Sequence, residues 1–358
     1  MMVIRPIAKT ELESLYQLAK KTGVGFTSLV PDKAILQKKI DVSLESFQKS
    51  ITAPGIESYL FVLEDTDAKQ IVGTCGVFGT VGLDEPFYSY HLGNIVHSSR
   101  ELKVHNIMPT LVLNNDYTGF SELCSLFLDE PYRHSKNGQL LSKARFLFLA
   151  QFPERFTDKI FAEMRGVCDE NGRSPLWESL GRHFFSLDFA KADELTVLGS
   201  KQFIAELMPN NPVYTALLNQ EARDVLGKVH QNTIPAKRLL EQEGFRYENY
   251  VDIFDGGPTI EARVQDIRAV RDSQLGKVII DNDLQSLTAE QQQADDSPYY
   301  LIANTKREEF RCILIQRERP LKQTLALSLE EAKALKVNMN DNIRMVALSP
   351  KNKRPVKK

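Results

Sequence analysis

Residues 123–150 read LCSLFL DEPYRHSKNGQ LLSKARFLFLA, and this stretch decides the predicted fold. It begins as an apolar strand, continues through a basic turn, and ends in a segment that places apolar side chains on one face of a helix. Those side chains are Leu140, Leu141, Ala144, Leu147 and Phe148. The helix begins at the turn, where unpaired backbone N–H groups and the positive end of the helix dipole favour an anion. With the added charge of Arg133 and Lys136, the turn can hold a pyrophosphate.

Two familiar phosphate-binding motifs are absent, because the chain has neither G-x-x-x-x-G-K-[ST] nor G-x-G-x-x-G with a ribose-binding acid. The remaining pattern runs from Arg133 to Gly138 and resembles the coenzyme A signature of the GNAT acyltransferase superfamily, [QR]-x-x-G-x-[GA]. Lys136 occupies the first glycine position of that signature, where a side chain restricts the backbone. The alternative is an ordinary strand-to-helix turn with a solvated basic rim, and the pattern alone leaves both open.

The composition predicts a globular protein of two or three domains, because the chain has 358 residues and is 42% hydrophobic. Its 45 basic and 47 acidic residues nearly cancel, so no global charge favours nucleic acid or an anionic membrane. Any anion site must be local. Polar residues soon follow the N-terminal stretch 1–6, which lacks the apolar run of a signal peptide or a membrane span. We therefore expect a cytoplasmic protein with no membrane partner.

The cysteines give no sign of a metal site. Cys75, Cys124, Cys168 and Cys312 are widely separated and form no C-x-x-C pair, which argues against a cysteine-based zinc site or a redox dithiol. We expect reduced and mostly buried thiols.

Mixed α/β organisation is predicted for the first 150 residues. Residues 3–7 read as a strand and residues 12–19 as an amphipathic helix. Residues 59–63 and 71–77 are apolar strands around a polar turn, which indicates a hairpin. Together with the strand, turn and helix of residues 123–150, they predict an α/β (α+β) layer domain.

One local pattern then occurs twice. Residues 174–185 and 234–247 each contain a helix that begins near a proline and ends at a glycine, with aromatic residues leading into a strand. Both copies resemble the last helix and strand of a GNAT fold. Any αβ connection can end in Gly-Phe, but two copies favour a duplicated half-domain, and hence tandem GNAT-like halves.

A separate β-rich domain is predicted after residue 265. Residues 299–303, 310–315 and 343–347 are short apolar runs, and the helix, turn and strand of residues 327–346 resemble those of small double-psi β-barrels. The expected division is a first GNAT-like half with the acyl-CoA turn, a second half, a small barrel-like domain and a basic tail. Their boundaries are 1–195, 196–265, 266–350 and 351–358.

Several longer blocks resemble the arginine N-succinyltransferases over nearly the whole chain. These blocks are residues 1–6, 121–124 with 126–129, 137–138 with 140–143, 162–167, 203–209 and 253–258. The family consists of the first enzymes of a bacterial arginine-degradation route. The resemblance implies succinyl transfer from succinyl-CoA to the α-amino group of L-arginine, giving N2-succinylarginine and CoA. It implies succinyl-CoA as co-substrate, no prosthetic group, no metal and no covalent enzyme intermediate.

The resemblance also implies roles for particular residues. It assigns succinyl-CoA contact to Leu126, whose side chain can act only as an apolar wall and whose backbone can bond. Leu128 lies on the same strand, and the predicted pyrophosphate cradle is made of Arg133, Lys136, Asn137 and Gly138. Proton donation falls to His230, the histidine of the segment 227–230. Imidazole suits that role because its ordinary pKa of about 6.5 lets it protonate the departing CoA thiolate near neutrality.

Three questions stay open at this level. The guanidinium of arginine favours a carboxylate, and the candidates are Glu122, Glu163, Glu206, Asp252 and Asp255. Ornithine is the close rival substrate, and a non-catalytic ligand-sensing subunit is the rival from another class. Either a homo-oligomer or a hetero-oligomer is compatible with the sequence.

Overall fold

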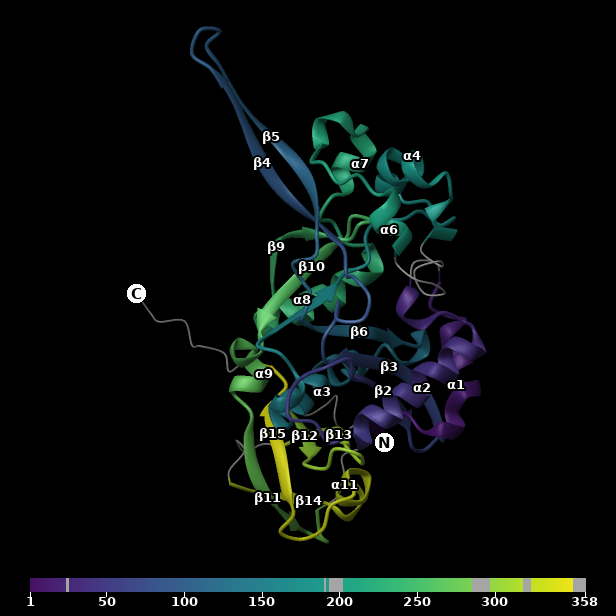
Figure 1. Cartoon of the computed structure of the whole chain (residues 1–358). Coiled ribbons are helices and arrows are strands. Elements are labelled where there is room, and N and C mark those ends of the chain that lie inside the picture. Colours follow the sequence, from purple (N-terminus) through teal and green to yellow (C-terminus); the bar gives the residue numbers. More distant parts are fainter. Residues whose placement is uncertain (24–25, 190, 193–201, 285–296, 318–322, 350–358) are drawn as a thin grey trace.

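The computed structural model describes residues 1–23, 26–189, 191–192, 202–284, 297–317 and 323–349 (Figure 1). The described strands form one mixed sheet in the order β14-β11-β15-β12-β13-β1-β2-β3-β6-β7-β10-β9-β4-β5-β8. The strands are β1 (Met2–Pro6), β2 (Ser58–Asp65), β3 (Gln70–Phe78), β4 (Ser89–Ser99), β5 (Val104–Asn114), β6 (Ser121–Leu128), β7 (Lys159–Glu163), β8 (Val213–Tyr214), β9 (Arg246–Val251), β10 (Pro258–Arg263), β11 (Gln274–Ile280), β12 (Tyr299–Asn304), β13 (Cys312–Gln316), β14 (Thr324–Leu327) and β15 (Asn342–Ala347). The mixed α/β prediction is confirmed.

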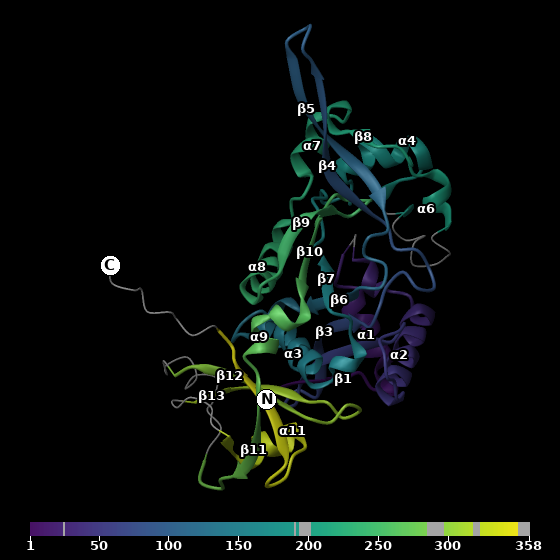
Figure 2. The same cartoon turned by 60° about the vertical axis from the view of Figure 1, so that its left-hand side comes forward.

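Helices cover both faces of the sheet around β2 and β3 (Figure 2). The helices are α1 (Leu12–Ala19), α2 (Lys33–Gln48), α3 (Asn137–Gln151), α4 (Arg182–Phe185), α6 (Gln202–Leu207), α7 (Gln220–Val225), α8 (Ile234–Glu243), α9 (Arg268–Arg271) and α11 (Leu329–Leu335). Side chains alternate along β2, so that Phe61 packs on the α3 side and Leu60 and Val62 pack against α1 and α2. The predicted first strand and helix and the β2–β3 hairpin are confirmed.

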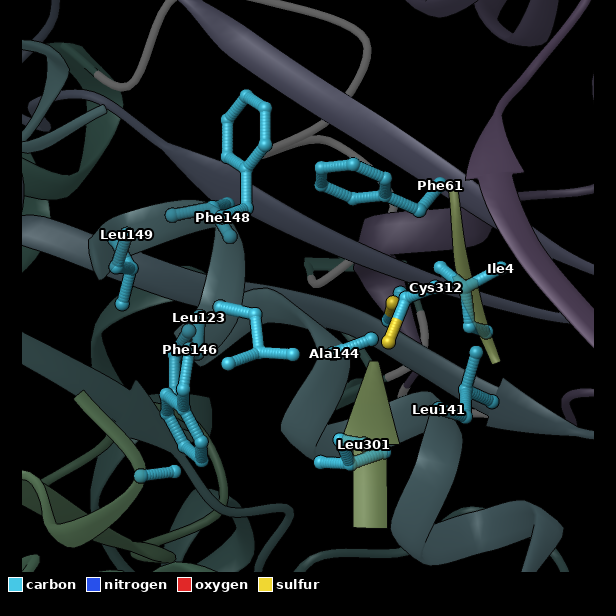
Figure 3. Close-up of a cluster of buried hydrophobic side chains, with 14 of the residues drawn as sticks. Ile4, Phe61, Leu123, Leu141, Ala144, Phe146, Phe148, Leu149, Leu301 and Cys312 are labelled. Atoms are coloured by element: carbon cyan, nitrogen blue, oxygen red, sulfur yellow. The ribbon is translucent and has the colours of Figure 1, made fainter. Parts of the chain in front are cut away.

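The largest core cluster surrounds α3 (Figure 3). Phe148 lies against Phe61 of β2 with ring centroids 5.1 Å apart, and Leu301 of β12 and Cys312 of β13 belong to the same cluster. The helix therefore packs against both the N-terminal strands and the C-terminal strands, which fixes its position under the sheet. All four cysteines are free and buried, as expected.

The prediction that α3 is amphipathic is wrong, because residues 140–149 are all buried. The polar side of the helix is covered by a buried ion network. The Lys143 ammonium lies 2.9 Å from a Glu243 carboxylate oxygen, and the Arg268 guanidinium lies 2.7 Å from the same oxygen. Lys143 also donates to the carbonyl of Leu348, and Arg268 donates to that of Ala347. Paired and hydrogen-bonded charges of this kind can be buried where single charges cannot.

The described C-terminal strands extend the sheet, because β13 pairs with β1 in antiparallel register. Helix α11 and strand β15 confirm the predicted helix, turn and strand of the tail. No pairing among the described strands closes this region into a barrel. No described helix has the length and apolar character needed to cross a membrane.

Of the two predicted helix-strand copies, the second is confirmed and the first is wrong. Helix α8 ends at Gly244, which has a φ of 111°, and the chain continues directly into β9. Gly181, in contrast, ends a π-helical turn with a φ of −59°, and the helix continues into α4. A Cβ on Gly181 would lie 2.2 Å from the indole of Trp177, so this glycine allows close packing and does not end the helix.

Candidate active site

The parallel pairing of β6 and β7 ends after two residues. Ser121 and Glu122 pair with β7, whereas β6 remains paired with β3 along its other edge and β7 remains paired with β10. Beyond Glu122 the two strands separate, and a cavity of about 980 Å³ opens between them. Its wall includes residues 122–128 of β6 and residues 162–165 at the end of β7. On this side β6 has no ladder partner beyond Glu122 among the described strands.

A β-bulge interrupts β6 beside this cavity. Thr74 pairs with Phe127 and Gly76 with Cys124, so β6 has one residue more than β3 between these pairs. Ser125 has a φ of 52°, and its carbonyl accepts a hydrogen bond of 2.8 Å from the Thr74 hydroxyl. A bulge bends the strand and changes the direction of its neighbouring backbone groups.

The basic turn joins the end of β6 to α3. Ser135 and Lys136 have left-handed conformations, with φ values of 48° and 64°. Glycine adopts this conformation at no steric cost, which explains why the coenzyme A signature has glycine where this chain has Lys136. The lysine keeps the backbone shape and adds a charge. The N–H groups of Lys136 and Gly138 have no acceptor among the described residues, so they are available to an anion.

The structure brings most of the predicted coenzyme A residues into one wall. The members are Leu126, Leu128, Arg133, Lys136 and Gly138. Asn137 is different, because it is buried and its side-chain amide donates to the Tyr132 carbonyl at 3.1 Å. Asn137 therefore stabilises the conformation of the turn and does not line the cavity.

His230 lies directly before residues 231–233, which line the same cavity, although it is not itself part of the wall. A β-bridge between Gly166 and Val229 positions this segment, and the His230 N–H donates to the Arg165 carbonyl at 2.9 Å. The backbone N–H of Asn232 donates to Nδ1 of His230 at 3.2 Å. In the neutral ring the proton is therefore on Nε2. Burial and the nearby Arg165 lower the pKa of His230 below its ordinary value.

Four of the five candidate carboxylates line the cavity, namely Glu122, Glu163, Asp252 and Asp255, and Glu206 does not. Asp255 accepts hydrogen bonds from the N–H groups of Gly166 and Gly257, at 2.6 and 2.8 Å.

Asp252 accepts from two N–H groups of its own loop, those of Phe254 and Asp255, each at 2.7 Å. Both aspartates therefore shape the loop between β9 and β10.

Many cavity residues were not found from the sequence, and among the charged ones are Arg145 on α3 and Arg165 after β7. Arg145 had a signal, since it and Lys143 are two charged residues in the largely apolar stretch 140–149. Arg165 follows a short strand, where a cation is unremarkable.

The cavity combines two chemical environments along β6. Unpaired backbone N–H groups and basic side chains lie at the C-terminal end of the strand, and carboxylates lie near its start, at Glu122. Residues 122–128 span about 20 Å in extended geometry. The arrangement suits a long ligand with an anionic end and a reacting group near a second, cationic ligand.

Comparisons with known proteins agree with this chemistry. A model of the arginine N-succinyltransferase beta subunit matches residues 2–269, and a model of the C-terminal domain of that subunit matches residues 285–347. An arginine N-succinyltransferase of Escherichia coli is 48% identical over 354 residues, which cover 99% of each chain.

Solved structures include subunit AI of the arginine/ornithine succinyltransferase of Pseudomonas aeruginosa, which is 36% identical. It has a TM-score of 0.88 and covers 98% of this chain and 99% of that chain. The loading GNAT-like domain of CurA from Lyngbya majuscula is more distant, with 13% identity and a TM-score of 0.35 over 74% of this chain and 98% of that one. The chain belongs to the arginine N-succinyltransferase family.

Proposed function

We propose how this arginine N-succinyltransferase, an N-acyltransferase of arginine catabolism, holds its two substrates. Succinyl-CoA lies between β6 and β7, with its pyrophosphate on the turn 133–138 and its thioester near the bulge at Leu126. L-Arginine enters from the carboxylate side, and His230 serves the proton transfer. The observation that carries this proposal is the early end of the β6–β7 pairing, which leaves one strand edge facing a cavity with a basic turn at its end.

The strand edge suits the pantetheine arm of coenzyme A. Its amide groups can pair with unpaired backbone groups of β6 as an added strand would. Leu126 would contribute its backbone at the bulge, where a redirected N–H can hold the thioester carbonyl and the oxyanion that forms from it. Leu128 would provide an apolar wall. The turn would supply Arg133, Lys136 and Gly138 to the pyrophosphate, with Asn137 bracing it.

The reaction moves one proton from nitrogen to sulfur. The neutral α-amine of arginine attacks the thioester carbonyl, the C–S bond breaks, and the CoA thiolate takes a proton. In our proposal the His230 imidazolium gives this proton from Nε2, the attacking nitrogen releases its extra proton to solvent, and solvent returns a proton to the ring. Protonation of the ring must displace the Asn232 N–H from Nδ1, and together with burial and Arg165 this makes the imidazolium a stronger acid.

For the guanidinium of arginine we favour Glu122 and Glu163. The two glutamates extend from the strand ends that border the cavity, whereas Asp252 and Asp255 hold the loop between β9 and β10 through their bonds to backbone N–H groups. A planar guanidinium suits carboxylate pairs better than the ammonium of ornithine does.

Three further parts of the proposal concern the whole chain. We retain the division at residues 195, 265 and 350, with His230 in the second segment. A cytoplasmic location fits four free cysteines, because reducing compartments keep thiols unpaired. We leave homo-oligomers and hetero-oligomers as equal alternatives.

The function is tested by a free-thiol release assay with succinyl-CoA and separate amino acids. We expect thiol release with L-arginine, and a higher kcat/KM for arginine than for ornithine in competition, with N2-succinylarginine identified by mass spectrometry. A preference for ornithine would contradict the arginine assignment. Binding of arginine without any consumption of succinyl-CoA would indicate a ligand-sensing subunit.

Gly138→Ala tests the pyrophosphate position. A Cβ at Gly138 meets only a Leu128 methyl group at 3.9 Å, so we expect stability to be unchanged or raised. The methyl group of the introduced alanine would occupy the space next to the unpaired N–H groups of the turn. We therefore expect the KM for succinyl-CoA to rise about tenfold, equivalent to about 1.4 kcal/mol, with kcat at saturation nearly unchanged.

The matched control is Gly93→Ala in β4, where the nearest atom lies 3.7 Å away. It should leave both kinetic constants unchanged. An unaltered KM for succinyl-CoA in Gly138→Ala would place the pyrophosphate elsewhere.

His230→Asn tests the proton donor while keeping an acceptor for the Asn232 N–H. We expect kcat to fall by roughly 100-fold or more and the KM for succinyl-CoA to change little. The ionisation of the substrate amine affects both enzymes equally and cancels in the ratio of wild-type to variant kcat. The pH dependence of this ratio therefore reports the ionisation of the His230 ring alone. That ratio should be constant below the pKa of His230, which lies under about 6.5, and should fall about tenfold per pH unit above it.

A ratio that rises with pH would show that the ring acts as a base, which contradicts proton donation. A kcat for His230→Asn equal to that of the wild type at every pH would remove the residue from the mechanism.

A further inference from the structure

Arg145 is a buried cation in the wall of the cavity. Its side chain extends from α3, and the residue is only 2% exposed. Its guanidinium makes three hydrogen bonds, all to neutral groups. Nε donates to the Ser142 carbonyl at 3.0 Å, one Nη to the Ser142 hydroxyl at 3.2 Å, and the other Nη to the Gly76 carbonyl at 3.4 Å. Since a guanidinium has five N–H donors, two of them have no partner among the described residues.

No carboxylate of the described residues forms an ion pair with Arg145, which separates it from the other buried cations of the chain. Lys143, two residues earlier, and Arg268 both bind the Glu243 carboxylate. Arg155 has Glu154 at 3.8 Å and acceptors on both Nη atoms. Burying a charge without an opposite charge costs several kcal/mol in proteins. Burial accordingly lowers the pKa of Arg145. An anionic ligand in the cavity would offset that cost.

Arg145 also lies at the right level of the cavity for the acyl group. It is eight residues after the start of α3 at Asn137, or about 12 Å along the helix from the turn. The guanidinium donates to the carbonyl of Gly76 in β3. Gly76 pairs with Cys124 of β6, which is next to the bulge residue Ser125. If the pyrophosphate occupies the turn and the thioester lies at the bulge, the guanidinium lies near the acyl end of the donor.

We propose that Arg145 binds the terminal carboxylate of the succinyl group and thereby selects succinyl-CoA over donors with an uncharged acyl chain. This inference rests on the proposed position of succinyl-CoA. The two remaining N–H donors suit a carboxylate, and charge-assisted bonds of this kind are stronger than neutral ones. The charge also counters the Glu122 and Glu163 carboxylates, which line the same cavity and would repel a second anion.

One rival is Lys39 of α2, because its ammonium lies 3.0 Å from the Ser125 hydroxyl at the bulge. It also donates to the Ser28 carbonyl at 2.8 Å and lies 5.7 Å from the centroid of the Phe78 ring. Lys39 is not part of the cavity wall. Arg145 is in that wall and is the more deeply buried, so the structure favours it.

The test compares kcat/KM for succinyl-CoA with kcat/KM for acetyl-CoA, both with L-arginine, in the full-length protein. In Arg145→Lys, which keeps the charge and loses the forked donors, we expect the succinyl-to-acetyl ratio to fall roughly 10-fold. In Arg145→Met we expect a fall of roughly 100-fold or more, since no donor remains. Neither variant should lower the rate with acetyl-CoA by more than about threefold.

Arg155→Lys is the matched control, because Arg155 is equally buried but does not line the cavity. It should leave the donor ratio unchanged even if it lowers stability. An equal loss with both donors in the Arg145 variants would indicate a purely structural role and overturn the proposal. So would a loss of succinyl selectivity in Lys39→Met but not in Arg145→Lys. If Arg145→Met does not fold, Arg145→Lys decides.

Failure of the proposed function gives a different result from failure of this inference. Without succinyl transfer in the wild type, the function itself fails. With normal transfer and an unchanged donor ratio in the variants, only the role of Arg145 fails.

Discussion

The early end of the β6–β7 pairing is the constraint on which the site depends. Two parallel strands normally continue their ladder, so each must be held by something else if they are to separate. β6 is held by β3 and bent by the bulge at Ser125. β7 is held by β10, and the Asp255 carboxylate binds the N–H of Gly166 just beyond its end. A Cβ on Gly166 would lie 2.5 Å from that carboxylate, so only glycine allows this contact without rearrangement. The open strand edge is therefore built into the sheet and does not depend on a bound ligand.

Helix α3 borders the cavity, and its position is fixed by charges as well as by apolar packing. Lys143 and Arg268 share the Glu243 carboxylate, which joins α3 to α8 and to the end of β15. Removing one partner from such a buried network typically costs 3–5 kcal/mol, so α3 is held firmly where it borders the cavity. Arg145 differs from these residues because it lines the cavity and bonds only to neutral groups among the described residues. The contrast between a cation paired with a carboxylate and one bonded only to neutral groups, both on one helix, is the basis on which we propose a structural role for Lys143 and a binding role for Arg145.

Local patterns predicted the elements that carry the site, and long-range packing decided the rest. Periodicity and capping residues were enough to predict three of these units. They are the strand, turn and helix of residues 121–151, the β2–β3 hairpin and the α8–β9 unit. Periodicity could not show that α3 is covered on every side, because the covering strands come from the C-terminal segment. Gly181 looked like a helix end, yet its real constraint is the Trp177 ring, a contact that no spacing rule contains. The bulge and the strand separation also required the structure, since both depend on pairing register.

Hydrogen exchange of the backbone amides on addition of succinyl-CoA tests the central claim most directly. If the donor lies along β6, exchange should slow in residues 123–128 and 133–138 and stay unchanged in the hairpin of β4 and β5, which projects from the body (Figure 1). The amides of β6 on the cavity side would gain hydrogen-bond partners that the sheet does not supply. Slowed exchange confined to another region, with residues 123–128 unaffected at saturating succinyl-CoA, would contradict the account.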